Sequence, residues 1–217
     1  TALRTAAGAA RSDPQIRAAI ADIQALYKGR ADCAGAIADM ATHTGDVIDA
    51  SDRLRIAETT LLGALDRDAR RLVSAAVKRV SVVTAVSPVA LLDVGFAALT
   101  YIGLIRGISR LYGGRPGFFG LLRLGRMVIA HLAVTGSLAL GDQLVGQVIG
   151  HGLAARISAR LGEGVLNGLL AARVGKAAIE MCRPMEFVAM PAPRVSELAA
   201  GIVVGQGPRP TTPAANS

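Results

Sequence analysis

The chain has 217 residues, of which 52% are hydrophobic, 18% are charged and only 3% are aromatic, and its formal net charge is +8. This balance excludes a disordered chain, which needs few apolar residues and much charge, and the length is sufficient to bury a core. The apolar residues are mainly Ala, Leu, Val and Ile, and 25 glycines accompany them. Such a composition favours helices that pack closely.

The charge is distributed unevenly along the chain. Residues 1–68 hold ten acidic and eight basic side chains, a net charge of −2, so the remainder carries +10. Residues 94–141 contain five arginines and no acidic residue. A region of one sign favours an anionic partner and does not indicate a fold. Cys33 and Cys182 match no metal-ligand spacing, which is typical of a protein from a reducing compartment.

Residues 1–65 have the pattern of a small acidic helical region. Ser12-Asp13-Pro14 is a helix start signal, because capping residues precede a proline at the first helical position. Apolar residues then recur at helical spacing, and Gly29 ends this helix. Shorter helices are predicted over residues 30–41 and 51–65.

Residues 66–187 form the predicted core domain, which is basic and apolar. The stretch Val80–Ile105 has a single charge, Asp93, and at about 1.5 Å per residue it is long enough to span a bilayer. Pro88 divides this stretch, and Asp93 would be costly in hydrocarbon. We therefore expect these helices to be buried against protein, with membrane insertion as the alternative. Asp93 is interpreted as a candidate for a buried structural ion pair.

A hairpin tip is predicted near residues 113–120, where glycines and Pro116 interrupt the helical pattern. The alternative interpretation is a hairpin end that only contacts solvent. Each arginine near an anionic leaflet contributes about 1 kcal/mol, and aromatic side chains can insert, so an anionic membrane is favoured over a nucleic acid, for which no fold signature is present. The predicted membrane-binding residues are Arg106, Arg110, Arg115, Phe118, Phe119, Arg123 and Arg126.

The rest of the chain contains no catalytic or metal-binding motif. A last long helix is predicted over residues 151–181, and residues 188–217 form a predicted flexible tail rich in Pro, Ala and Gly, in which Leu198–Val204 could dock as a short element. The glycines of Gly162–Gly168 have the wrong spacing for a dinucleotide-binding loop. We therefore expect no catalytic residues, no metal and no cofactor, that is, a protein that is not an enzyme.

Six segments of the core domain also match a known sequence pattern. They are Ser87–Asp93, Leu104–Arg106, Leu111–Gly113, Leu153–Arg160, Gly168–Arg173 and Ala178–Pro184. Through them the chain resembles the YcjF-like family of bacterial inner-membrane proteins, whose function is uncharacterised. The resemblance covers roughly residues 66–187, and residues 1–65 only loosely.

The resemblance implies a membrane setting and a pair of N-terminal transmembrane helices, which this chain lacks. The start at Thr1, inside a helical pattern and without Met, is interpreted as a trimmed beginning. The resemblance also implies a separate GTPase-like protein partner, and it implies no catalytic residues.

Together these observations predict an all-α fold of long antiparallel helices that form an elongated helical bundle, assembled as a homodimer. The expected location is the cytoplasmic face of a bacterial inner membrane. The hypothesised function is to bind anionic phospholipid through the basic surface and to organise or bend the membrane, with no nucleic acid partner. The alternative is a partner-binding module that couples to a GTPase-like protein through the acidic helices of residues 1–65.

Overall fold

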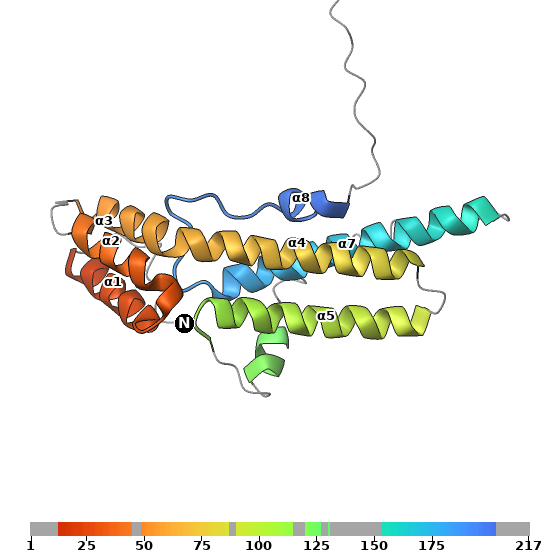
Figure 1. The fold of residues 1–217 in the computed structure, drawn as a ribbon, viewed down its shortest axis with the longest axis horizontal. Coiled ribbons are helices and arrows are strands. Elements are labelled where there is room, and N and C mark those ends of the chain that lie inside the picture. Colours follow the sequence, from red (N-terminus) through yellow and green to blue (C-terminus); the bar gives the residue numbers. More distant parts are fainter. Residues whose placement is uncertain are drawn as a thin grey trace, which may run out of the picture.

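The computed structural model describes residues 13–44, 49–86, 90–114, 120–126, 130 and 153–202. Within these ranges every regular element is helical and no strand occurs, which confirms the all-α prediction for this part of the chain. The longest helices are α4 (Gly63–Val86), α5 (Ala90–Leu111) and α7 (Leu153–Cys182). These three helices pack against one another along the long axis of the molecule, and α5 and α7 both run opposite to α4 (Figure 1).

Three shorter helices gather at one end of the molecule (Figure 1): α1 (Asp13–Tyr27), α2 (Ala34–Thr44) and α3 (Ala50–Ala57). A 3-10 turn over Ala31–Cys33 leads into α2. Among the described residues α1 starts at Asp13, within the predicted start signal, and its predicted end at Gly29 is confirmed. Gly29 has a φ of 87°, in the left-handed region that glycine adopts at helix ends.

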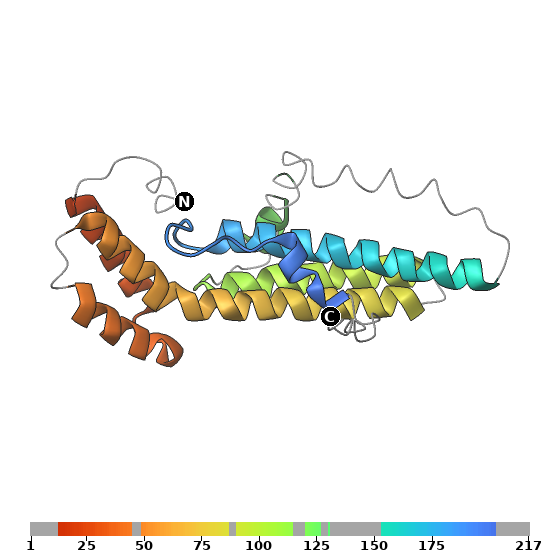
Figure 2. The same ribbon diagram turned by 90° about the horizontal axis from the view of Figure 1, so that it is seen from above.

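Helix α3 continues into α4 through a π-helical turn, Glu58–Leu62, so that one helical run extends from Ala50 to Val86 (Figure 2). The sequence predicts a domain boundary between residues 65 and 66, and this position lies inside the run. Leu61, Leu62 and Leu65 are buried in the same core cluster as Ala69 and Val73, so the core continues across this position. The run ends just before the break that Pro88 predicts.

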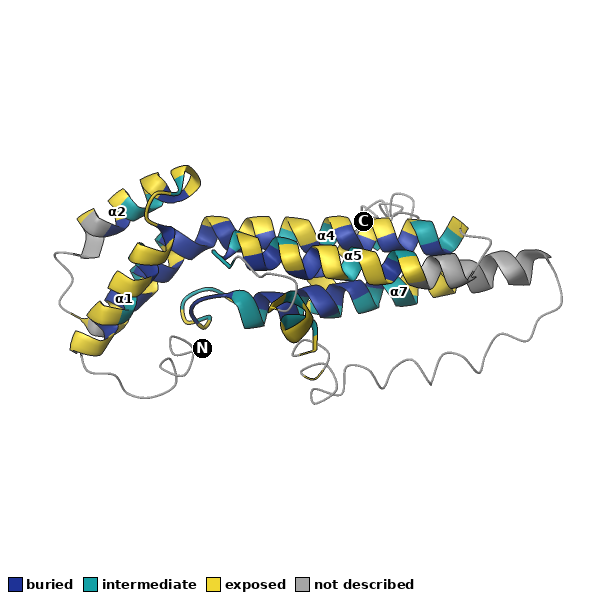
Figure 3. Cartoon of the chain, turned by 90° about the horizontal axis from the view of Figure 1, so that it is seen from below, coloured by how far each residue is buried: buried dark blue, intermediate teal, exposed yellow. Residues whose placement is uncertain are grey.

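The core lies between α4, α5 and α7, whose buried faces point toward one another (Figure 3). Val73, Val77 and Val80 of α4 are fully buried. Helix α7 approaches α4 closely because it presents glycines there: a Cβ at Gly175 would overlap both methyl groups of Val73, and one at Gly168 would overlap a side-chain oxygen of α4. These small residues therefore allow close contact between two helices of the same chain.

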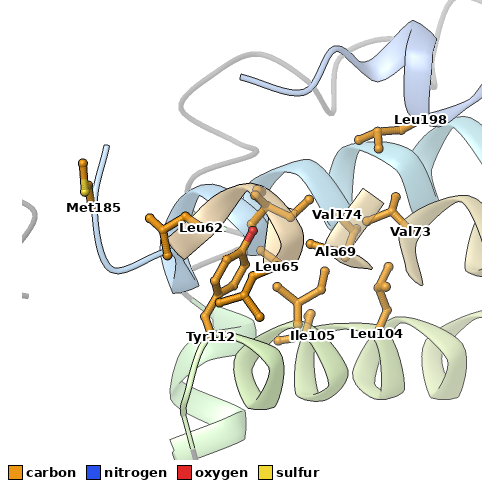
Figure 4. Close-up of a cluster of buried hydrophobic side chains, with 14 of the residues drawn as sticks. Leu62, Leu65, Ala69, Val73, Leu104, Ile105, Tyr112, Val174, Met185 and Leu198 are labelled. Carbon is orange, nitrogen blue, oxygen red and sulfur yellow. The ribbon is translucent and has the colours of Figure 1, made fainter. Parts of the chain in front are cut away.

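Beyond α7 the chain turns back along α4 and α7 (Figure 2). It forms α8 (Val195–Leu198) and a 3-10 turn over Ala200–Ile202. Residues 188–202, which the sequence assigns to a flexible tail, pack here because Leu198 is buried among the core side chains (Figure 4) and Arg70 of α4 pairs with Glu197 at 2.5 Å. Residues 203–217 lie outside the described part of the chain.

Candidate functional site

The arginines predicted to meet a membrane lie in two places that the structure describes. Arg106 and Arg110 are exposed near the C-terminal end of α5, and Arg123 and Arg126 are exposed on the helical segment 120–126, below α5 in Figure 1. Beside the last pair, Leu122 is 56% exposed. We call these four arginines and Leu122 the basic surface.

The segment 120–126 is amphipathic. Leu121 and Leu124 pack against the hydrophobic core, whereas Leu122, Arg123 and Arg126 face outward. Leu122 lies beside Arg123 and one helical turn from Arg126, so the outward face of this segment carries apolar and cationic side chains together. One face of the segment therefore packs on the core, and the other face is both cationic and apolar, as the sequence predicts for the hairpin tip.

The remaining predicted site residues fall outside what the structure describes. Arg115, Phe118 and Phe119 belong to residues 115–119, and the side chain of Asp93 on α5 is also outside the described part. The proposed membrane contacts of the first three residues, and the proposed ion pair of Asp93, therefore stay predictions.

The C-terminal end of α5 is fixed by its own backbone. Gly113 has a φ of 88°, its N–H donates to the carbonyl of Arg110 at 3.1 Å, and the N–H of Gly114 donates to the carbonyl of Ser109 at 2.7 Å. These two bonds and the left-handed glycine form a Schellman motif, a common way to end a helix. The predicted turn thus begins at Gly113.

Helix α1 also holds this end of α5. Arg30, just after α1, donates from Nη1 to the carbonyl of Leu111 at 2.7 Å, and the Tyr27 hydroxyl donates to the carbonyl of Tyr112 at 3.4 Å. Both acceptors are at the end of α5, where carbonyl groups have no partner within the helix. The acidic helical region and the basic surface are therefore joined through the end of α5.

A buried charge cluster, which the sequence did not predict, lies where α7 ends. Arg183, Glu58 and Asp66 are each 2% exposed or less. Nη2 of Arg183 lies 2.9 Å from Glu58 Oε1 and 2.9 Å from Asp66 Oδ2, and Nε donates to Asp66 Oδ1 at 3.1 Å. Nη1 donates to the carbonyls of Met185 and Glu186.

The two carboxylates of the buried charge cluster have further partners. The Tyr112 hydroxyl donates to Asp66 Oδ1 at 2.7 Å, and the backbone N–H groups of Val188 and Ala189 donate to Glu58 Oε2. Figure 4 shows Tyr112 between the start of α4 and the end of α5. Because its charges are paired and hydrogen-bonded, the cluster is a structural joint between α4, α5 and the chain after α7.

Burial raises the pKa of the Tyr112 hydroxyl above its ordinary value, and the negative charge of Asp66 raises it further. Burial likewise raises the pKa of Tyr27 and that of the Cys33 thiol. All three groups are therefore held in their neutral forms. Among the residues that the structure describes, no group of three His, Cys, Asp or Glu side chains is placed to hold a metal ion.

The described part of the chain contains no helix with the length and apolar character required to cross a membrane.

A family described as "Domain of unknown function (DUF697)" matches residues 48–206. The chain is 55% identical over 183 residues to a UPF0283 membrane protein of Chelativorans sp. (strain BNC1), which covers 84% of this chain and 52% of the relative. It is 50% identical over 201 residues to a UPF0283 membrane protein of Bradyrhizobium diazoefficiens, covering 92% of this chain and 59% of the relative. The chain thus spans about half the length of the curated relatives it matches. No solved structure matches it.

Proposed function

The chain belongs to the DUF697 family, and because its relatives are named membrane proteins, we propose that it acts at a membrane without being an enzyme. It binds anionic phospholipid through the basic surface and organises or bends the membrane there. The observation that supports this proposal is the exposed Leu122 beside Arg123 and Arg126. Four arginines near an anionic leaflet contribute about 1 kcal/mol each, enough to bring the leucine to the lipid.

The YcjF-like resemblance adds a location to this proposal, the cytoplasmic face of a bacterial inner membrane. Arginine clusters suit this face, because anionic lipids give the cytoplasmic leaflet a negative surface potential. An elongated helical bundle that assembles as a homodimer is also part of the proposal. Light scattering of the purified chain tests the dimer, and a monomer mass at all concentrations would contradict it.

Co-sedimentation with vesicles tests lipid binding. We expect the chain to sediment with vesicles that contain phosphatidylglycerol and to stay in solution with neutral phosphatidylcholine vesicles. The double variant Arg123→Glu/Arg126→Glu should lose most of this binding while keeping its helical circular dichroism. Equal binding to neutral and anionic vesicles, or none to either, would refute the electrostatic proposal.

A matched control separates the basic surface from net charge. Arg67 and Lys78 are exposed on α4 and do not belong to the basic surface, and Arg67→Glu/Lys78→Glu changes the net charge by the same amount. We expect this control to retain most of the binding to anionic vesicles. Equal loss in the two double variants would mean that binding follows overall charge and not this surface.

A second candidate function is coupling to a GTPase-like protein. It is favoured by exposed carboxylates on the helices at one end of the molecule, at Asp22, Asp32, Asp39 and Asp52. A pull-down of the partner that survives Arg123→Glu/Arg126→Glu but is lost when these four aspartates become asparagines would support it. The reverse pattern would exclude the acidic helices as the contact.

A further inference from the structure

An open apolar groove of about 470 Å³ runs between α4 and α5. Ala76 of α4 and Leu104 of α5 form its buried floor, 7% and 6% exposed. Leu72 and Leu99 form its rims and are 41% and 71% exposed. The groove therefore presents apolar surface that the described part of the chain leaves uncovered, and burying it against an apolar occupant would be favourable.

The groove has room for an occupant at Gly103, because a Cβ placed there would meet no atom within 4 Å. Gly107 lies at one end, opposite Leu72. Since α4 and α5 are antiparallel, Phe96 and Arg79 lie toward the other end. The length from Phe96 to Gly107 is about 16 Å at 1.5 Å per residue.

The charged side chains that the structure describes at the groove are of one sign. Among the described residues, Arg79 lines the groove and is exposed, no acidic residue lines it, and Arg106 is exposed beside Gly107. Complementarity therefore calls for an occupant with an apolar body and an anionic group. A second copy of this chain docked through the same face would bring identical cationic rims together, which disfavours a symmetric contact here.

We propose that this groove binds one acyl chain of an anionic phospholipid, with the lipid phosphate at Arg79. The length agrees, because half of a hydrocarbon core about 30 Å thick is about 15 Å, close to the length of the groove. The proposal rests on the proposed membrane function and deepens it. The basic surface brings the molecule to the membrane, and the groove takes a single lipid.

Calorimetric titration of the 217-residue chain with dihexanoyl phosphatidylglycerol, below its critical micelle concentration, tests the groove without vesicles. We expect saturable binding with a stoichiometry of one, and binding of dihexanoyl phosphatidylcholine that is about tenfold weaker. Equal affinity for the two lipids would overturn the assignment of phosphate to Arg79. Inorganic phosphate that binds as tightly as the lipid would overturn the role of the apolar groove.

Two matched pairs of variants test where the lipid binds. Gly103→Leu fills the groove, whereas Gly162→Leu adds the same side chain at an exposed, open position of α7. Arg79→Glu reverses the groove cation, whereas Lys78→Glu makes the same charge change at the neighbouring exposed residue. We expect about tenfold weaker lipid binding in the first member of each pair only. Equal effects within a pair would overturn the proposal.

The same variants distinguish lipid binding in the groove from membrane binding by the basic surface. Gly103→Leu should still sediment with anionic vesicles, because the basic surface is intact. Arg123→Glu/Arg126→Glu should still bind the short-chain lipid. Wild-type chain that sediments with anionic vesicles but does not bind the monomeric lipid would refute the groove and leave the proposed function standing. Binding of the monomeric lipid without binding to anionic vesicles would refute the proposed function and leave the groove standing.

Discussion

Arg183 uses all five N–H groups of its guanidinium in the buried charge cluster. Two carboxylates and two backbone carbonyls accept them, and the guanidinium also lies 3.9 Å from the centre of the Phe187 ring. A lysine has three donors at a single point and could not reach these acceptors together. The residue type therefore follows from the geometry of its acceptors.

Removing this guanidinium should be strongly destabilising. Arg183→Met would leave Glu58 and Asp66 buried without a cation, and we expect the free energy of unfolding to fall by about 3–5 kcal/mol. Urea titration followed by circular dichroism measures the loss. Arg71→Met is the control, because Arg71 forms an exposed pair with Asp68, worth at most about 1 kcal/mol. A loss equal to that of the control would contradict the proposed role.

The two buried tyrosines predict a pH dependence of stability. Their pKa values are raised in the folded state, whereas an unfolded tyrosine titrates near pH 10, so above about pH 10 the unfolded state loses protons that the folded state keeps. Below about pH 10 these tyrosines therefore do not change the free energy of unfolding with pH. Above that pH the free energy of unfolding falls by about 1.4 kcal/mol per pH unit for each tyrosine. Urea titrations from neutral to alkaline pH measure this slope, and Tyr112→Phe should make it shallower.

At the scale of the elements, α7 owes its close packing on α4 to its glycines. Gly164, Gly168 and Gly175 are all buried, and a Cβ at each would come within 3 Å of an atom of α4. Glycine is a poor helix former, so its use here follows from contact with α4 and not from helix propensity. The sequence shows the glycines, and the structure shows the helix that they face.

Two glycine substitutions in α7 should therefore change stability in opposite directions. Gly175→Ala gains helix propensity but forces its methyl group into Val73, and overpacking of this kind costs about 1–3 kcal/mol. Gly162→Ala gains up to about 1 kcal/mol of propensity, because its Cβ meets nothing. We expect a lower unfolding midpoint for the first variant and a higher one for the second. The same direction of change in both would contradict the packing of α7 on α4.

At the scale of the whole molecule, the net charge is positive, and exposed charges of both signs meet near the end of α5. The chain carries +8 overall, and the basic surface lies beside the end of α5 while exposed carboxylates lie on α1 to α3. A positive net charge attracts a molecule toward an anionic surface. It also predicts strong sensitivity to salt.

Binding to anionic vesicles should fall steeply as salt is added. The screening length shortens from about 10 Å at about 0.1 M salt to about 3 Å at about 1 M, so exposed arginines lose most of their attraction. Vesicle co-sedimentation across this range measures the effect. Binding of the short-chain lipid in the groove should fall much less, because its acyl chain is held by apolar contact. Vesicle binding that does not respond to salt would contradict the electrostatic proposal.

The sequence by itself determined the helices, several of their ends and the exposed arginines. Asp13, Gly29 and Gly113 mark helix ends through local backbone preferences, and helical periodicity identifies the apolar faces. Only the tertiary structure decided the buried charge cluster and the groove between α4 and α5. Glu58 accepts a hydrogen bond from the backbone N–H of Val188, which is 130 residues away. Periodicity carries no information on contacts at that separation. Local preferences act between neighbours in the chain, whereas a buried charge or a groove depends on which distant faces meet.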